Sequence, residues 1–155
     1  MINIVLYQPE IPQNAGNIIR LCANTGAKLH FIKPLGFRLN DKQLRRSGLD
    51  YIDHTLIHQY DDFSNFIESL NADQRIIIIS TKSTTIYSNY RFKSNDCLLF
   101  GQESSGLPSS IHQHPRVYQS LRIPMQSESR SINLSNSVAI LSYEALRQQS
   151  FSNLS

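Results

Sequence analysis

Short apolar runs alternate with amphipathic segments along most of the chain. The runs predict six strands, at residues 2–7, 28–33, 54–59, 75–80, 96–100 and 118–123. The segments between them predict helices at residues 12–25, 41–48, 61–70 and 108–112, and a last helix from Asn133 or Ser135 to about residue 147. This alternation predicts an α/β fold, with one domain over residues 1–149, a parallel sheet covered by helices on both faces, and a flexible polar tail at residues 150–155.

The strongest local signals lie in the first helix and the fourth strand. Pro12 suits the first turn of a helix, and Gly26 suits a left-handed residue that ends it. The apolar side of this helix consists of Ala15, Ile18, Ile19 and Cys22, and the polar side of Gln13, Asn17, Arg20 and Asn24. Four consecutive isoleucines at residues 76–79 predict a strand that is buried on both faces. In the second helix, Asp41 is the expected cap, Lys42, Arg45 and Arg46 are basic, and Gly48 is the expected end.

The stretch from Ile123 to Arg147 combines a strand end, a polar loop and a capped helix. Pro124 ends the strand because proline has no N–H to donate. The helix that follows the loop places Leu134, Val138, Leu141 and Ala145 on one face. A loop beyond the carboxyl end of a strand is a common site for a small ligand in α/β proteins. The serines and asparagines of this loop, with Arg130, suit a polar or anionic ligand, although an ordinary solvated loop fits the composition equally well.

Composition sets limits on the possible functions. The 155 residues carry a net charge of +3, which permits a polyanionic partner without demonstrating one. Cys22 and Cys97 lie in apolar segments, as expected of reduced thiols in a cytoplasmic protein. No apolar run approaches the length that crosses a membrane, so no membrane partner is expected.

Several catalytic classes lack their motifs. Residues 101–106 have the spacing of a phosphate loop, but Leu107 and Pro108 stand where Lys and Ser or Thr are required. The sequence has neither the glycine fingerprint of a dinucleotide site nor a nucleophile elbow. Its five histidines have no metal-ligand spacing, so no metal is expected, and His54 and His58 are interpreted as solvated or strand-edge residues.

Three turns remain, and together they resemble the motifs of SPOUT-class RNA ribose methyltransferases. The first is Asn14-x-Gly16-Asn17-x-x-Arg20, the second is residues 100–108 (FGQESSGLP), and the third is residues 123–138 (IPMQSESRSINLSNSV). The opening segment and short length are more similar to the smallest members, which methylate the wobble ribose of tRNA. The resemblance implies a C-terminal trefoil knot, S-adenosyl-L-methionine (SAM) as cofactor, and a homodimer with shared active sites.

The resemblance also assigns roles to individual residues. It places SAM against Ile79, Gly101, Ile123, Met125, Ser131 and Leu134. It makes Arg20, Asn14 and Asn136 catalytic, with Arg20 holding the phosphate next to the reactive ribose. Gly101 is expected to let the backbone approach the cofactor. Glu103 is either a carboxylate of the active site or an acceptor of backbone N–H groups within its own turn.

The RNA contacts expected from charge and aromatic character are Lys82, Arg130 and Tyr143. Lys42, Arg45 and Arg46 could extend this basic surface, although a basic run of this kind is usually a solvated helix face. The predicted function is SAM-dependent 2′-O-methylation of the wobble nucleotide, cytidine 34 or modified uridine 34, in the anticodon stem-loop of tRNA, with leucine isoacceptors expected. Two alternatives stay open: methylation of another tRNA or rRNA ribose, and RNA binding without catalysis.

Overall fold

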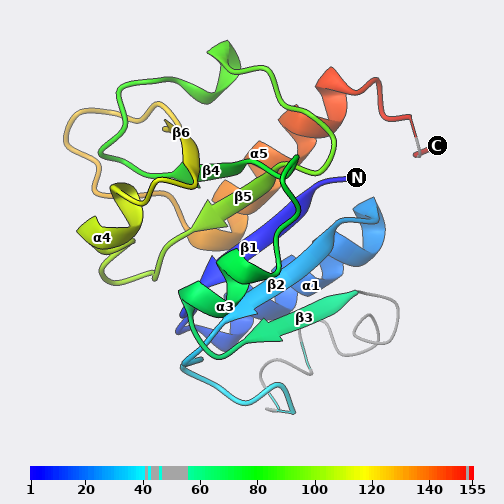
Figure 1. The fold of residues 1–155 in the computed structure, drawn as a ribbon, viewed down its shortest axis with the longest axis vertical. Coiled ribbons are helices and arrows are strands. Elements are labelled where there is room, and N and C mark those ends of the chain that lie inside the picture. The colour runs from blue at the N-terminus through cyan, green and yellow to red at the C-terminus, as the bar shows by residue number, and fades with distance from the viewer. Residues whose placement is uncertain (41, 43–45, 47–55, 153) are drawn as a thin grey trace.

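A computed structural model describes residues 1–40, 42, 46, 56–152, 154 and 155. They form an α/β fold around a six-stranded sheet with the order β3-β2-β1-β5-β4-β6 (Figure 1). The strands are β1 (Asn3–Tyr7), β2 (Lys28–Ile32), β3 (Ile57–Tyr60), β4 (Ile76–Ile79), β5 (Cys97–Phe100) and β6 (Val117–Leu121). All five strand pairings are parallel. The predicted parallel sheet is therefore confirmed.

Helices cover both faces of this sheet, as predicted. The helical elements are α1 (Pro12–Thr25), α3 (Phe63–Glu68), the 3₁₀ helix η2 (Tyr87–Asn89), α4 (Ser109–His112) and α5 (Leu134–Gln148). Helices α1 and α5 pack together in one core with Ile4 and Leu98. Phe66 of α3 and Ile111 of α4 belong to a second core with Val5 and Leu99. Because neighbouring residues of a strand point to opposite faces, the two cores lie on the two sides of the sheet.

The first helix and the four-isoleucine strand agree with their predictions. Helix α1 begins at Pro12 and is followed by Gly26, whose φ of 71° is left-handed. Its predicted apolar residues are buried, and its predicted polar residues are exposed. In β4, Ile76, Ile77 and Ile78 are buried and Ile79 is partly exposed. Burial raises the pKa of the Cys22 thiol to about 12, as suits the predicted core thiol.

Two predicted boundaries are wrong. Asp62, rather than Asp61, caps α3: its carboxylate accepts a hydrogen bond from the backbone N–H of Asn65, whereas Asp61 pairs with Lys33. Strand β6 ends at Leu121 rather than at residue 123. After Leu121 the chain leaves β4 and Arg122 bridges to Ile86 instead.

Part of the predicted structure lies outside the described residues. This applies to the basic helix at residues 41–48, except for Lys42 and Arg46, which are both exposed. It also applies to the first part of the third predicted strand, of which residues 57–59 are confirmed as strand. The predicted flexibility of the tail stays a prediction.

A buried histidine, which the sequence pattern did not indicate, links three strands. His30 of β2 is 6% exposed and stacks on His58 of β3, with ring centroids 5.0 Å apart. Its Nδ1 lies 3.0 Å from the Tyr60 hydroxyl, and its Nε2 lies 3.2 Å from Oδ1 of Asn3. Burial, together with the positive charges of His58 and Lys28, lowers the pKa of His30 to about 4. His30 is therefore neutral at neutral pH.

This histidine predicts a pH-dependent stability. Between its unfolded pKa of 6.5 and its folded pKa of about 4, the unfolded chain binds a proton that the folded chain does not. The free energy of unfolding should therefore fall as the pH drops through this window, by about 2 kcal/mol from about pH 7.5 to 5. Urea unfolding of the wild type and of His30→Gln at both pH values measures the difference. An equal pH slope in the two proteins would contradict the prediction.

Candidate active site

A cavity of about 550 Å³ lies where β4, β5 and β6 end. Because the strands are parallel, their carboxyl ends meet at one edge of the sheet, and the loops that follow them form the cavity wall. Three loops contribute, at residues 80–82, 101–107 and 123–133, and Asn14 of α1 and Leu134 of α5 close one side. The polar loop singled out in the sequence thus stands at the position expected for a ligand.

All six residues predicted to bind the cofactor line this cavity. They are Ile79, Gly101, Ile123, Met125, Ser131 and Leu134. Three other predicted functional residues, Asn14, Lys82 and Arg130, line it as well. Residues separated by up to 120 positions in the sequence are therefore brought to a single site. Its walls are partly apolar, and Lys82 and Arg130 are its two cations.

Glu103 joins the cavity loop to the start of α1. Its carboxylate accepts hydrogen bonds from the backbone N–H groups of Glu10, at 2.9 Å, and Ile11, at 3.1 Å. Ile11 is the N-cap of α1 and has no side-chain oxygen of its own to cap the helix. A carboxylate at this end also interacts favourably with the helix dipole. Of the two roles considered for Glu103, acceptance of backbone N–H groups is the one observed, but the donors are the two residues that precede α1 and not residues of its own turn.

Asn14 and Asn133 extend this connection to α5. The Asn14 amide donates to Glu103 at 3.3 Å, and its carbonyl oxygen accepts from the Asn133 amide at 3.0 Å. The side-chain Oδ1 of Asn133 in turn accepts from the backbone N–H groups of Ser135 and Asn136 and so caps α5. Asn133 is thus the helix cap that the sequence left open between two residues. A continuous chain of hydrogen bonds holds the beginnings of α1 and α5 against the 101–107 loop.

Glu103→Gln should destabilise the fold. The amide has a single acceptor oxygen for the two backbone N–H groups that now share one carboxylate, and weakening such a helix-end cap costs about 0.5–2 kcal/mol. Urea unfolding measures the loss. Glu128→Gln is the matched control, because it removes the same charge from an exposed loop. Equal stabilities of the two variants would contradict the structural role of Glu103.

Gly101 is required by the protein's own backbone. An added Cβ at this position would lie 2.6 Å from the Leu107 nitrogen and 2.7 Å from the Gly106 Cα. The loop is closed by hydrogen bonds between Gln102 and Gly106 in both directions. This glycine therefore permits the tight turn that forms the cavity wall, and the approach of its backbone to the cofactor stays a prediction.

Three predicted residues lie outside the cavity. Arg20, Asn136 and Tyr143 are exposed and do not belong to its lining. Arg20 is six residues beyond Asn14 in α1, about 9 Å along the helix. Asn136 and Tyr143 lie on α5, the helix that packs beside α1 in the same core. The structure thus places these three on one pair of helices but not at the cavity of their own chain.

His112 is a cavity residue that sequence reasoning missed. It lies at the end of α4, and burial together with the charge of Lys82 lowers its pKa. No motif surrounds it, so the sequence held no signal for its position.

No group of three or more His, Cys, Asp or Glu side chains within the described residues could hold a metal ion. In the same part of the chain, no helix is long and apolar enough to cross a membrane.

A model of the SpoU rRNA Methylase family matches residues 1–143. The chain belongs to this family. The match confirms the resemblance that the three motifs indicated. This SpoU-family chain is 51% identical over 152 residues to a tRNA (cytidine(34)-2′-O)-methyltransferase of Yersinia pestis, across 96% of this chain and 94% of that protein. It is also 51% identical over 148 residues to the enzyme of the same name from Escherichia coli, with the same coverage.

Solved structures agree with the family assignment. One, described as giving structural insights into the 2′-OH methylation of C/U34 on tRNA, superposes with a TM-score of 0.92 at 43% identity, over 97% of both chains. A putative RNA methyltransferase from Bacillus anthracis superposes with a TM-score of 0.89 at 43% identity, over 99% of this chain and 98% of that one. A more distant SpoU methyltransferase from Streptomyces viridochromogenes, in complex with AdoMet, shares the fold at 20% identity and a TM-score of 0.86, over 96% of this chain and 60% of that one.

Proposed function

We propose that this protein is a SAM-dependent tRNA 2′-O-methyltransferase that modifies the wobble ribose, at cytidine 34 or modified uridine 34, with leucine tRNAs as the expected substrates. The observation that carries this proposal is the cavity, in which all six predicted SAM contacts stand together. Relatives that are about half identical over nearly the whole chain carry the matching activity in their names.

The cavity fits the proposed cofactor in size and chemistry. Its volume of about 550 Å³ lies within the usual range for sites of small ligands. Ile79, Ile123 and Met125 offer apolar walls for a flat adenine, and the 101–107 loop offers backbone donors and acceptors for its edge. When bound, SAM supplies an electrophilic methyl group on its sulfonium. The polar residues Ser131, Lys82 and Arg130 stand at the same cavity for the remaining polar groups and for RNA phosphate.

Arg20 is proposed to orient the ribose through the neighbouring phosphate. A ribose hydroxyl attacks well only when it is held in line with the methyl group and its proton has an acceptor. A guanidinium does not release its own proton near neutral pH, so Arg20 acts by orientation and charge stabilisation. Asn14 and Asn136 are proposed to assist at the two helix starts, where Asn14 bridges Glu103 and Asn133.

A homodimer with shared active sites would bring Arg20 to a cavity. On the chain itself Arg20 is exposed and outside the cavity lining. The neighbouring helix α5 exposes Tyr143, of which 47% is accessible, and Asn136. We infer that the outer surface of α1 and α5 packs on a second copy, so that Arg20 of one subunit faces the cavity of the other and Tyr143 contacts the RNA.

The C-terminal trefoil knot is proposed on the path of the chain. Strand β6 is the edge of the sheet, yet α5, which follows it, packs with α1 against the central strands. The 123–133 segment must therefore cross the ends of β4 and β5, next to the 80–82 and 101–107 loops (Figure 1).

A cytoplasmic location is proposed together with the tRNA substrate.

Mapping methylated nucleotides tests the activity. Bulk tRNA, incubated with the protein and SAM, should gain a 2′-O-methyl group at position 34 of leucine tRNAs, detected by mass spectrometry of nuclease fragments. Methylation at another tRNA or rRNA ribose would redirect the proposal to that substrate. Absence of SAM binding in calorimetry, with RNA binding retained, would replace the enzyme by an RNA-binding module.

A further inference from the structure

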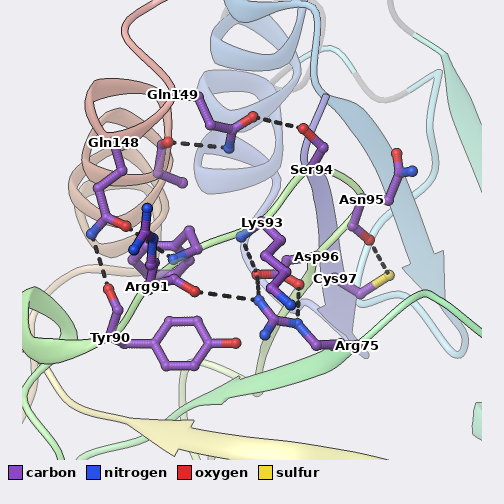
Figure 2. A network of polar contacts seen from close by, with 12 residues as sticks. Arg75, Tyr90, Arg91, Lys93, Ser94, Asn95, Asp96, Cys97, Gln148 and Gln149 are labelled. Atoms are coloured by element: carbon purple, nitrogen blue, oxygen red, sulfur yellow. Dashed lines mark hydrogen bonds and ion pairs between the residues drawn. The ribbon is translucent and has the colours of Figure 1, made fainter.

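A second polar cluster lies at the amino ends of β4, β5 and β6, at the sheet edge opposite the cavity (Figure 2). At its centre, Arg75 donates two hydrogen bonds to the Asp96 carboxylate, at 2.7 and 2.6 Å. A third hydrogen bond runs from Arg75 to the carbonyl oxygen of Arg91, at 3.3 Å. Three contacts therefore fix the guanidinium of Arg75 in one orientation.

Two tyrosines lie against this fixed cation. The guanidinium carbon of Arg75 is 5.3 Å from the ring centre of Tyr90 and 4.7 Å from that of Tyr118. Tyr118 nevertheless stays 60% exposed, although it is a large aromatic residue on an edge strand. Its ring is thus held in place from one side while most of its surface faces solvent, which is the arrangement of a stacking platform.

A bulge in β6 presents Tyr118 to solvent. The partners of Ile76 and Ile77 in β6 are Val117 and Gln119, so Tyr118 is an extra residue between them. Bulges of this kind turn a side chain away from its regular direction and occur often beside functional sites. The exposure of Tyr118 therefore follows from the register shift between β4 and β6.

Two exposed cations, Arg91 and Lys93, lie on the segment that is held by Arg75 and Asp96. Arg91 is held through its carbonyl oxygen by Arg75, and the Lys93 backbone N–H donates to Asp96 at 2.8 Å. Neither Arg91 nor Lys93 takes part in the three ion pairs found within the described residues. Arg91 also lines a hollow of about 360 Å³, together with Ser88, Asn89, Tyr90, Phe92 and Gln148. An exposed aromatic ring with cations that lack acidic partners is complementary to single-stranded RNA.

We propose that Tyr118, Arg91 and Lys93 form a second RNA contact, on which an unpaired base stacks against Tyr118 while the two cations neutralise phosphates. Strand β6 and the two residues that follow it join this surface to the cavity: Ile123 is five residues beyond Tyr118, a chain length of at most roughly 18 Å. The proposed contact therefore binds the tRNA that is methylated at the cavity, a few nucleotides from the methylated ribose. This inference rests on the proposed function and extends it to how the substrate is held.

Binding of fluorescently labelled leucine tRNA at several salt concentrations tests the contact. Tyr118→Leu keeps an apolar cover on Arg75 but removes the aromatic face, so the Kd should rise about tenfold, whereas Tyr118→Phe should bind like the wild type. Arg91→Gln should weaken binding and reduce the slope of log Kd against log salt by about 0.7. The affinity for SAM, which binds at the opposite edge, should stay unchanged in all three variants.

Matched controls come from the β3 side of the sheet. Lys33→Gln removes one exposed cation and Leu56→Ala removes one exposed apolar side chain, and both should leave the tRNA affinity unchanged. Wild-type affinity and salt slope in Tyr118→Leu and Arg91→Gln would overturn the proposal, and so would an equal loss in the controls. If the wild type binds tRNA but does not methylate position 34, the proposed function fails while the contact is still decided by the binding data.

Discussion

Gly101→Val is expected to abolish SAM binding. The new side chain would meet the backbone of Gly106 and Leu107, at distances no real Cβ adopts, and backbone atoms cannot turn aside as a flexible side chain can. The loop that forms one wall of the cavity must therefore open. If opening of this loop costs about 3 kcal/mol of the free energy of SAM binding, the affinity for SAM falls roughly 100-fold. Isothermal titration calorimetry with SAM measures the effect.

A second glycine in the same loop gives the control. Gly106 has a φ of 68°, but a Cβ there would meet nothing within 4 Å. Gly106→Ala should therefore introduce only the strain of a left-handed residue, about 1–2 kcal/mol, without a clash. Circular dichroism and thermal unfolding show whether each variant is folded. Wild-type SAM affinity in folded Gly101→Val would refute the assignment of this cavity to the cofactor.

Local patterns were sufficient for much of the fold. The isoleucine run at residues 76–79, and the proline and glycine that bound α1, are short-range signals, and the structure agrees with them. The cap Asn133 was also within reach, because a cap needs only the residues that follow it. For the site, the six residues expected to contact SAM line one cavity, because Ile79 ends β4, Gly101 follows β5 and the other four follow β6, and the carboxyl ends of these strands meet at one edge.

Long-range contacts explain what the sequence could not predict. Strand β6 ends early because Arg122 pairs with Ile86, a partner 36 positions away that no local pattern reveals. Asp61 and Asp62 are equally good caps by type, but Asp62 caps α3 and Asp61 pairs with Lys33, which follows β2 and is distant in sequence. Glu103 acts on the start of α1 and His30 is buried by neighbouring strands, so both depend on how the sheet is assembled.

Arg20→Ala is expected to lower the rate of methylation by a factor of about 100 or more while keeping the fold and SAM affinity, as is typical when a group that positions the transition state is lost. Arg20 is an exposed residue in the middle of α1, so its truncation leaves the buried side of the helix intact. Single-turnover methylation of tRNA and calorimetry with SAM measure the two quantities. Arg38→Ala, which removes an exposed arginine elsewhere, is the control and should retain activity.

Mixing two inactive variants distinguishes a shared active site from two separate ones. If Arg20 serves the cavity of the other subunit, a mixed dimer of Arg20→Ala and Gly101→Val contains one complete site: the intact cavity of the first chain faces the intact arginine of the second. With random exchange, half of the dimers are mixed and each has one working site, so the mixture should recover about a quarter of the wild-type activity. If Arg20 serves its own cavity, every site in the mixture lacks one of the two residues. A mixture that stays inactive, although mass spectrometry shows that the subunits have exchanged, would therefore exclude the shared site.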